Sequence, residues 1–218
     1  MKFEHLDRIV FAGDSVTDMG STNPVGEGMF DNLGHSYVRI IDNLLASVYP
    51  ERFIRVTNSG ISGNTSRDLL ARWERDVLNL NPQWVSICIG INDVWRQFDC
   101  PAMPEYACTP EEYRQNLTAM LDSLRGRVKG VFLLTPYYME PNPEDSMRKK
   151  MDEYGAVVKK VTAEAELPCI DLQKEFCDYL QYRHSSYLMW DRVHPGWIGS
   201  LIIARAFLRE VGFDRPIL

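Results

Sequence analysis

The sequence lacks several features that would place it in a particular class of protein. It has five cysteines among 218 residues, an odd number without a Cys-x-x-Cys pair, so neither a complete disulfide framework nor a zinc site is indicated. Acidic side chains outnumber basic ones by 30 to 24, and this net charge of −6 gives no electrostatic footprint for a phosphate backbone. We therefore expect reduced thiols and no nucleic-acid partner.

Long apolar runs are also absent. No stretch approaches the ~20 residues that a membrane-spanning helix requires. Glu4 and Asp7 stand where a signal peptide would need an uninterrupted apolar segment. No internal repeat, flexible linker or block of like charge divides the chain. These absences predict a single cytoplasmic domain over residues 1–218, with no membrane partner.

What the chain does contain is a series of short apolar runs, partly β-branched. Each has the length of a strand that is buried on both faces of a sheet. Helical patterns separate these runs, which predicts right-handed crossovers and an α/β fold with a five-stranded parallel sheet between two layers of helices. The predicted strands are residues 8–12, 53–58, 84–90, 128–135 and 167–172.

The predicted helices follow from apolar residues that recur at helical spacing. The segment from Thr109 to Glu112 is typical of a helix start, with an N-cap, a proline in the first turn and a capping-box glutamate. Two predicted loops, 16–32 and 91–108, are unusually long and leave the carboxyl ends of their strands, where long loops tend to be functional. The expected helices cover residues 37–48, 69–80, 109–125, 147–164 and 197–211.

Ser15 is the first candidate for chemistry. It follows the first predicted strand, on a turn that Gly13 can bend, so its hydroxyl would lie at the carboxyl edge of the sheet. A nucleophile would be well placed there. A role as a helix cap or turn residue would explain the serine equally well.

Two further signals follow the second and third strands. Gly60 and Gly63 would let backbone N–H groups approach a ligand without obstruction by a Cβ atom, and the Asn92 amide could donate a further N–H. Such donors suit a developing oxyanion. Alternatively, the glycines shape a strand-to-helix turn capped by Asn64 or Thr65, and Asn92 is a turn residue.

A late loop pairs Asp191 with His194. The spacing of three residues lets the carboxylate hold the imidazole Nδ1–H, which is the expected form of a general base. A lone histidine is more often a packing or surface residue. The joint occurrence of all four signals, on strand ends that a doubly wound sheet brings to one edge, is hard to attribute to chance.

These blocks resemble those of the GDSL/SGNH hydrolases over nearly the whole chain. The one departure is Val16, where the family motif has leucine. The resemblance implies a three-layer, flavodoxin-like α/β/α fold and needs neither a metal nor a cofactor. It also implies a nucleophilic Ser15, a basic His194 oriented by Asp191, and an oxyanion hole. The donors of that hole would be the backbone N–H groups of Ser15 and Gly63 and the side-chain amide of Asn92.

Within the family, residues 60–65, 90–95 and 190–195 are most similar to small intracellular acetylxylan esterases. This resemblance implies a cytoplasmic, homo-oligomeric serine esterase. It would remove O-acetyl groups from acetylated xylo-oligosaccharides through an acetyl-serine intermediate.

Aromatic side chains beside the predicted site are candidates for binding the sugar, because flat rings are good platforms for it. Packing beneath the loops is an equal alternative for each ring. Asp14, Asp18 and Asp93 would add negative charge that disfavours anionic esters, or would anchor turns and caps. The candidate substrate-binding residues are Asp14, Trp95, Tyr137 and Trp190, and Tyr138 and Trp197 lie near them in the sequence.

Three alternatives stay open at this point. Another SGNH hydrolase, a lysophospholipase or acyl-thioesterase, would need a long apolar tunnel for its acyl chain. A metal-dependent phosphoesterase would use Asp14, Asp18, Asp93, Asp191 and His194 as metal ligands. A non-catalytic flavodoxin-like binding module has no nucleotide-binding motif to support it.

Overall fold

A largely parallel sheet forms the centre of the fold in the computed structural model, which describes residues 1–216. Its six strands lie in the order β2-β3-β1-β4-β5-β6, and all neighbours are parallel except β2 and β3. The α/β class is thus confirmed, with one more strand than predicted, because β2 forms within the predicted loop 16–32. The strands are β1 (Arg8–Gly13), β2 (Gly26–Glu27), β3 (Arg55–Gly60), β4 (Trp84–Cys88), β5 (Gly130–Leu134) and β6 (Cys169–Ile170).

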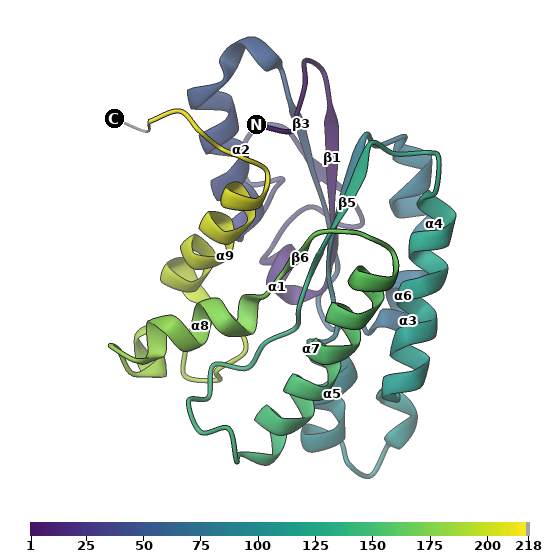
Figure 1. The fold of residues 1–218 in the computed structure, drawn as a ribbon, viewed down its shortest axis with the longest axis vertical. Coiled ribbons are helices and arrows are strands. Elements are labelled where there is room, and N and C mark those ends of the chain that lie inside the picture. The colour runs from purple at the N-terminus through teal and green to yellow at the C-terminus, as the bar shows by residue number, and fades with distance from the viewer. Residues whose placement is uncertain (217–218) are drawn as a thin grey trace.

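Helices cover both faces of the sheet, which makes three layers (Figure 1). On one side α2 (Tyr37–Val48) packs against α9 (Gly196–Glu210), which also contacts α8 (Leu172–Leu180). On the other side α6 (Pro110–Leu124) packs against α3 (Ser66–Ala71) and α7 (Ser146–Glu164). The shorter helices are α1 (Ser15–Asp18), α4 (Trp73–Asp76) and α5 (Ile91–Asp99), with 3₁₀ turns at Pro50–Arg52, Leu78–Leu80, Pro104–Tyr106 and Ser185–Tyr187.

Three predicted segments differ from the structure. The segment 91–108 begins with helix α5, in which Ile91, Val94, Trp95 and Phe98 recur at helical spacing and Asn92 and Asp93 are also buried. The helix predicted over 69–80 is broken at Arg72 into α3, α4 and a 3₁₀ turn. The strand predicted over 167–172 has only two ladder residues and runs into helix α8, which was not predicted.

The start of α6 is also only partly as predicted. Thr109 is the N-cap and accepts a hydrogen bond from the Glu112 N–H at 3.2 Å, with Pro110 in the first turn. The Glu112 carboxylate does not close a capping box. It pairs instead with Arg67 on α3 at 2.6 Å, because α3 packs beside α6.

The core beneath α9 contains a cluster of phenylalanines that packs against the C-terminal part of the helix. Phe207 on α9 contacts Phe3, Phe11 and Phe132 at ring-centroid distances of 6.3, 5.1 and 5.2 Å, and all four are fully buried. Burying each ring contributes roughly 2–3 kcal/mol. The cluster therefore holds α9 to the sheet, and the segment just before its first residue is His194 and Pro195.

No helix in the described part of the chain has both the length and the apolar character to cross a membrane.

Candidate active site

The turn after β1 explains each residue of the Gly-Asp-Ser tripeptide. A Cβ atom on Gly13 would lie 2.4 Å from the Cys88 carbonyl oxygen, so only glycine allows β4 to approach so closely. Asp14 is the N-cap of α1 and accepts a hydrogen bond from the Val16 N–H at 3.0 Å. Ser15 is then the first residue of the helix, and its side chain is partly exposed at the carboxyl end of β1.

The structure brings Ser15 and the Asp191–His194 pair together. His194 Nε2 lies 3.0 Å from Ser15 Oγ, and His194 Nδ1 lies 2.7 Å from Asp191 Oδ2. The other carboxylate oxygen of Asp191 accepts the N–H groups of Val193 at 2.9 Å and His194 at 3.0 Å. Because the carboxylate requires a proton on Nδ1, Nε2 of a neutral imidazole is left as an acceptor for the serine proton.

The two backbone N–H groups predicted to bind an oxyanion, those of Ser15 and Gly63, are left without a hydrogen-bond partner in the described part of the chain. Ser15 opens α1, where a helix has no acceptor of its own, and Gly63 lies in the exposed loop after β3. Neither N–H has an acceptor within residues 1–216. Gly63 has φ +82°, a conformation that other residues rarely adopt, so glycine is required there for backbone reasons.

Asn92 has an amide orientation determined by its neighbours. Its Nδ2 donates to the Asn64 carbonyl oxygen at 3.0 Å, and its Oδ1 accepts from Arg96 Nη2 at 3.0 Å. An acceptor faces the nitrogen and an obligatory donor faces the oxygen, so the reversed amide would be disfavoured at both ends. One hydrogen of Nδ2 is left over for a ligand.

Arg72 links the segments that carry these donors, and the sequence gives no sign of it. Its buried guanidinium donates to the Gly13 carbonyl oxygen at 3.0 Å, to the Ser59 carbonyl oxygen at 2.9 Å and to Asn64 Oδ1 at 2.7 Å. Asp76 pairs with it at 3.3 Å. Arg72 thus connects the ends of β1 and β3 with the loop of Gly63, a role that no prediction from the sequence included.

The three aspartates near the site are anchors rather than parts of an acidic surface. Asp14 is 1% exposed and caps α1, so the predicted contact of Asp14 with substrate is wrong. Asp93 is fully buried and accepts the Ser66 N–H at 3.0 Å, while Asp18 accepts a hydrogen bond from Ser62 Oγ at 2.6 Å. Burial raises the pKa of Asp14 to about 7 and that of Asp93 to about 6.

The candidate aromatic residues divide into two groups. Tyr137 is 1% exposed and donates its hydroxyl to the Val193 carbonyl oxygen at 3.0 Å, so it supports the histidine loop and cannot be the predicted platform for a sugar. Trp95 is half-buried, with its ring 6.1 Å from the His194 ring, and Trp190 is 85% exposed. These two tryptophans can still contact a bound molecule.

Within residues 1–216, no group of three or more His, Cys, Asp or Glu side chains is arranged to hold a metal ion. The four aspartates that a metal-dependent phosphoesterase would use serve instead as the caps and partners described above. The five cysteines are free thiols.

A doubly wound sheet with serine, histidine and aspartate aligned at the carboxyl ends of its strands defines an α/β serine hydrolase. The model of the GDSL-like lipase/acylhydrolase family matches residues 11–200, and the chain belongs to that family. It is 50% identical over 214 residues, 98% of each chain, to an acetylxylan esterase of Geobacillus stearothermophilus. The crystal structure of that esterase, Axe2, covers 98% of each chain with a TM-score of 0.96. LAE5, an α/β hydrolase from the metagenome of Lake Arreo in Spain, is 44% identical over 99% of this chain and 100% of its own, also with a TM-score of 0.96.

The Axe2 structures include variants at positions that can be compared directly. Those described as catalytic mutants replace Ser15, Asp191 and His194, and this chain has the same residues under the same numbers. Trp190 is likewise shared. A further Axe2 variant replaces a tryptophan at position 215, where this chain has Arg215.

Proposed function

We propose that the protein is a serine esterase that removes O-acetyl groups from carbohydrate. The observation that carries this proposal is the continuous contact from Asp191 through His194 to Ser15, with distances of 2.7 and 3.0 Å. The acetylxylan esterase activity of the 50% identical Geobacillus protein supports the choice of ester.

The first half of the reaction forms an acetyl-serine. Ser15 Oγ attacks the carbonyl carbon of the ester while its proton passes to His194 Nε2, and Asp191 stabilises the resulting imidazolium. Negative charge develops on the carbonyl oxygen, which the N–H groups of Ser15 and Gly63 and the Asn92 amide would bind. The C–O bond to the sugar then breaks, and the sugar oxygen takes the proton from His194.

The second half restores the enzyme. Water gives a proton to His194 Nε2 as it attacks the acetyl carbon, and the same donors bind the second oxyanion. The bond to Ser15 Oγ breaks, Oγ recovers its proton from His194, and acetate leaves. Each half uses the residues in the same places, so no additional acid or base is required.

We propose acetylated xylo-oligosaccharides as the substrates. One Axe2 structure is described as that of an acetyl-xylooligosaccharide esterase, and Trp95 and Trp190 are available here as surfaces for sugar rings. The test is acetate release from acetylated xylo-oligosaccharides, compared with hydrolysis of p-nitrophenyl esters of increasing acyl length. Hydrolysis of long-chain esters alone would support a lysophospholipase or acyl-thioesterase instead.

We also propose that the enzyme is a cytoplasmic homo-oligomer. Trp190 is 85% exposed and Trp197 61% exposed, and aromatic side chains of this kind are enriched at interfaces between subunits. The five free thiols fit a reducing compartment. Sedimentation of the wild type and of Trp190→Ser, together with cell fractionation, tests both statements. A monomeric wild type would contradict the first.

A further inference from the structure

The turn that carries Asp191 and His194 contains a backbone conformation that needs support. Arg192, between them, has φ +61°. This left-handed conformation costs roughly 1–2 kcal/mol in a residue with a Cβ atom. The turn lies outside the sheet ladder. Asp191 Oδ1 holds the N–H groups of Val193 and His194 from within the turn, and contacts from outside it hold the carbonyl groups and the Arg192 side chain.

Those contacts come from the segment that follows β5. Met139 N–H donates to the Arg192 carbonyl oxygen at 2.9 Å, and the Tyr137 hydroxyl donates to the Val193 carbonyl oxygen at 3.0 Å. The third contact is an ion pair between the Glu140 carboxylate and Arg192 Nη1. Glu140 is only 10% exposed and Arg192 is 38% exposed, so water screens this pair less than a pair of two fully exposed side chains.

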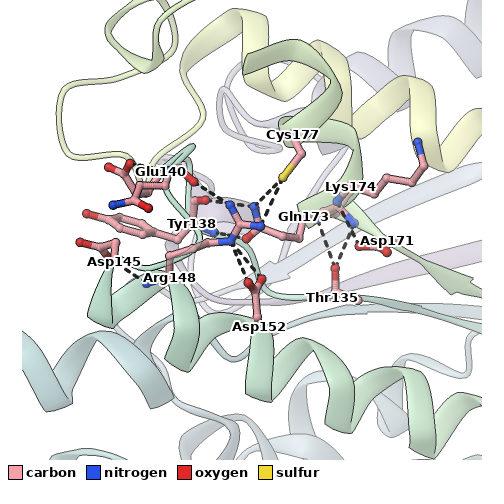
Figure 2. Close-up of polar contacts among 12 residues, drawn as sticks. Thr135, Tyr138, Glu140, Asp145, Arg148, Asp152, Asp171, Gln173, Lys174 and Cys177 are labelled. Atoms are coloured by element: carbon pink, nitrogen blue, oxygen red, sulfur yellow. Dashed lines mark hydrogen bonds and ion pairs between the residues drawn. The ribbon is translucent and has the colours of Figure 1, made fainter. Parts of the chain in front are cut away.

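The segment after β5 is itself held at several points (Figure 2). Gln173 from α8 accepts the Tyr138 N–H at 2.8 Å and donates to the Tyr138 carbonyl oxygen at 3.1 Å. Arg148 from α7 donates to the Glu140 carbonyl oxygen at 2.6 Å and is fixed in turn by Asp152 at 3.0 Å. The segment is therefore attached to α8 through Tyr138 and to α7 through Glu140, and Glu140 can hold a neighbouring turn.

Glu140 has a further fixed contact that orients its carboxylate. Its Oε1 accepts the Asn142 N–H at 2.8 Å, which leaves Oε2 toward Arg192. With both oxygens assigned, the carboxylate has one orientation. Its charge then favours the position of Arg192 in which the carbonyl groups of the turn meet Met139 and Tyr137.

We propose that Glu140 is a positioning residue that keeps Arg192 in its left-handed conformation and thereby aligns His194 with Ser15. The inference rests on the proposed esterase function. Glu140 touches neither Ser15 nor His194, so it acts only through Arg192. A displacement of about 1 Å at reacting groups lowers a rate by roughly 100-fold, which sets the scale of the expected loss.

Two substitutions of Arg192 separate the ion pair from the backbone conformation. Arg192→Met and Arg192→Gly both remove the ion pair, but only glycine adopts φ +61° without strain. We expect Arg192→Met to lower kcat for acetate release by roughly 10- to 100-fold. Arg192→Gly should be at least several-fold more active than Arg192→Met, and KM should change little in either.

Glu140→Gln completes the test because it keeps the size of the side chain and removes its charge. We expect a kcat loss comparable to that of Arg192→Met, and little further loss when Glu140→Gln is added to Arg192→Gly. Glu144→Gln is the matched control, since Glu144 lies on the same segment, is exposed and pairs with Lys149 and not with Arg192. Phosphonylation of Ser15 by a fluorophosphonate should slow in parallel with kcat, and thermal melting should establish that each variant folds.

The inference would be overturned if Glu140→Gln lowered kcat by the same factor in the wild type and in the Arg192→Gly protein. A change in KM alone would also overturn it. So would equal activities of the two Arg192 variants. Failure of the proposed function is a separate result. In that case the wild type would not release acetate, or Ser15→Ala would still do so.

Discussion

The two halves of the site are held in different ways. Ser15, Gly63 and Asn92 follow β1, β3 and β4, the three neighbouring strands at the centre of the sheet. Asp191 and His194 lie in a turn that no strand contains and that precedes α9. The first half is positioned by the sheet, whereas the second depends on contacts with the segment after β5.

This difference separates stability from activity. The supports of the first half, such as Arg72, are buried groups, and the loss of Arg72 would take a charged donor from the carbonyl oxygens of Gly13 and Ser59. The support of the second half is an ion pair beside a turn, which can be lost without opening the core. We therefore expect loss of the residues that support the first half to affect folding, and loss of the ion pair that supports the second half to affect mainly the rate.

The largest effect should come from Ser15→Ala, which removes the point where the two halves meet. Loss of the nucleophile should lower ester turnover by at least about 1,000-fold, with an unchanged melting temperature, because the partly exposed hydroxyl contributes little to packing. Acetate release measures the turnover, and thermal unfolding measures the melting temperature. Ser62→Ala is the control, since the Ser62 hydroxyl is bound to Asp18 and should not replace the nucleophile.

Asn92→Ala should have the next largest effect, within the first half. Loss of one oxyanion donor lowers kcat by about 10²–10³-fold. Because the donor acts in the transition state, KM should change much less than kcat. A fall in affinity without a fall in kcat would show that Asn92 binds the substrate and not the oxyanion.

Arg96→Met tests whether the orientation of that amide matters. With Oδ1 of Asn92 released, the amide can reverse, and we expect kcat to fall by roughly 10-fold, the scale of a lost charge-assisted hydrogen bond. The two substitutions should not be additive. If Arg96→Met has its full effect in the Asn92→Ala protein, Arg96 acts by another route.

Much of the fold could be predicted because strands buried on both faces leave continuous apolar runs in the sequence. Strands β1, β4, β5 and β6 follow that pattern, whereas β3 is buried but mostly polar, with Val56 as its one aliphatic side chain. The missed strand, β2, has two residues, and the missed helix α8 begins inside a run that continues the apolar character of β6. Helix α5 was also missed, although Ile91, Val94, Trp95 and Phe98 recur at helical spacing, so a signal for this helix was present in the sequence.

The residues aligned at the site could also be predicted, since each lies just after a strand or beside its partner in the chain. The residues that hold them in place could not be predicted. Arg72 binds groups 8 to 59 positions away, and Glu140 lies 52 positions from Arg192. Such contacts exist only in the folded protein, and a single arginine or glutamate in a helix or loop carries no local signal of them.

Arg72→Met is the direct test of the buried support. We expect it to lower the free energy of unfolding by about 3 kcal/mol or more, because buried acceptors lose a charged donor. Denaturant unfolding measures this. Arg75→Met is a matched control, as Arg75 pairs with the same Asp76 at 2.6 Å but is exposed, so its loss should matter far less. Similar losses in the two variants would remove the contrast between the halves.

The smallest expected effect is a pH dependence from Asp14. Burial raises the pKa of this carboxyl to about 7, above the ordinary 3.8 that it regains on unfolding. Between these values the folded protein keeps a proton that the unfolded chain has lost, so stability falls as the pH rises, and the full penalty is present above pH 7.

Asp14→Asn cannot ionise, yet its side-chain oxygen can still accept the Val16 N–H. Relative to wild type it should therefore be more stable at pH 8 than at pH 5, by at least about 1 kcal/mol. Asp122→Asn, at an exposed position paired with Arg125, should show far less of this difference. Because Asp14 belongs to the first half of the site, acetate release per folded molecule should change less than the free energy of unfolding. If the activity changed with pH as much as the free energy of unfolding, the Asp14 charge would take part in the chemistry. The contrast between a first half whose supports determine stability and a second half whose support determines the rate would then not hold.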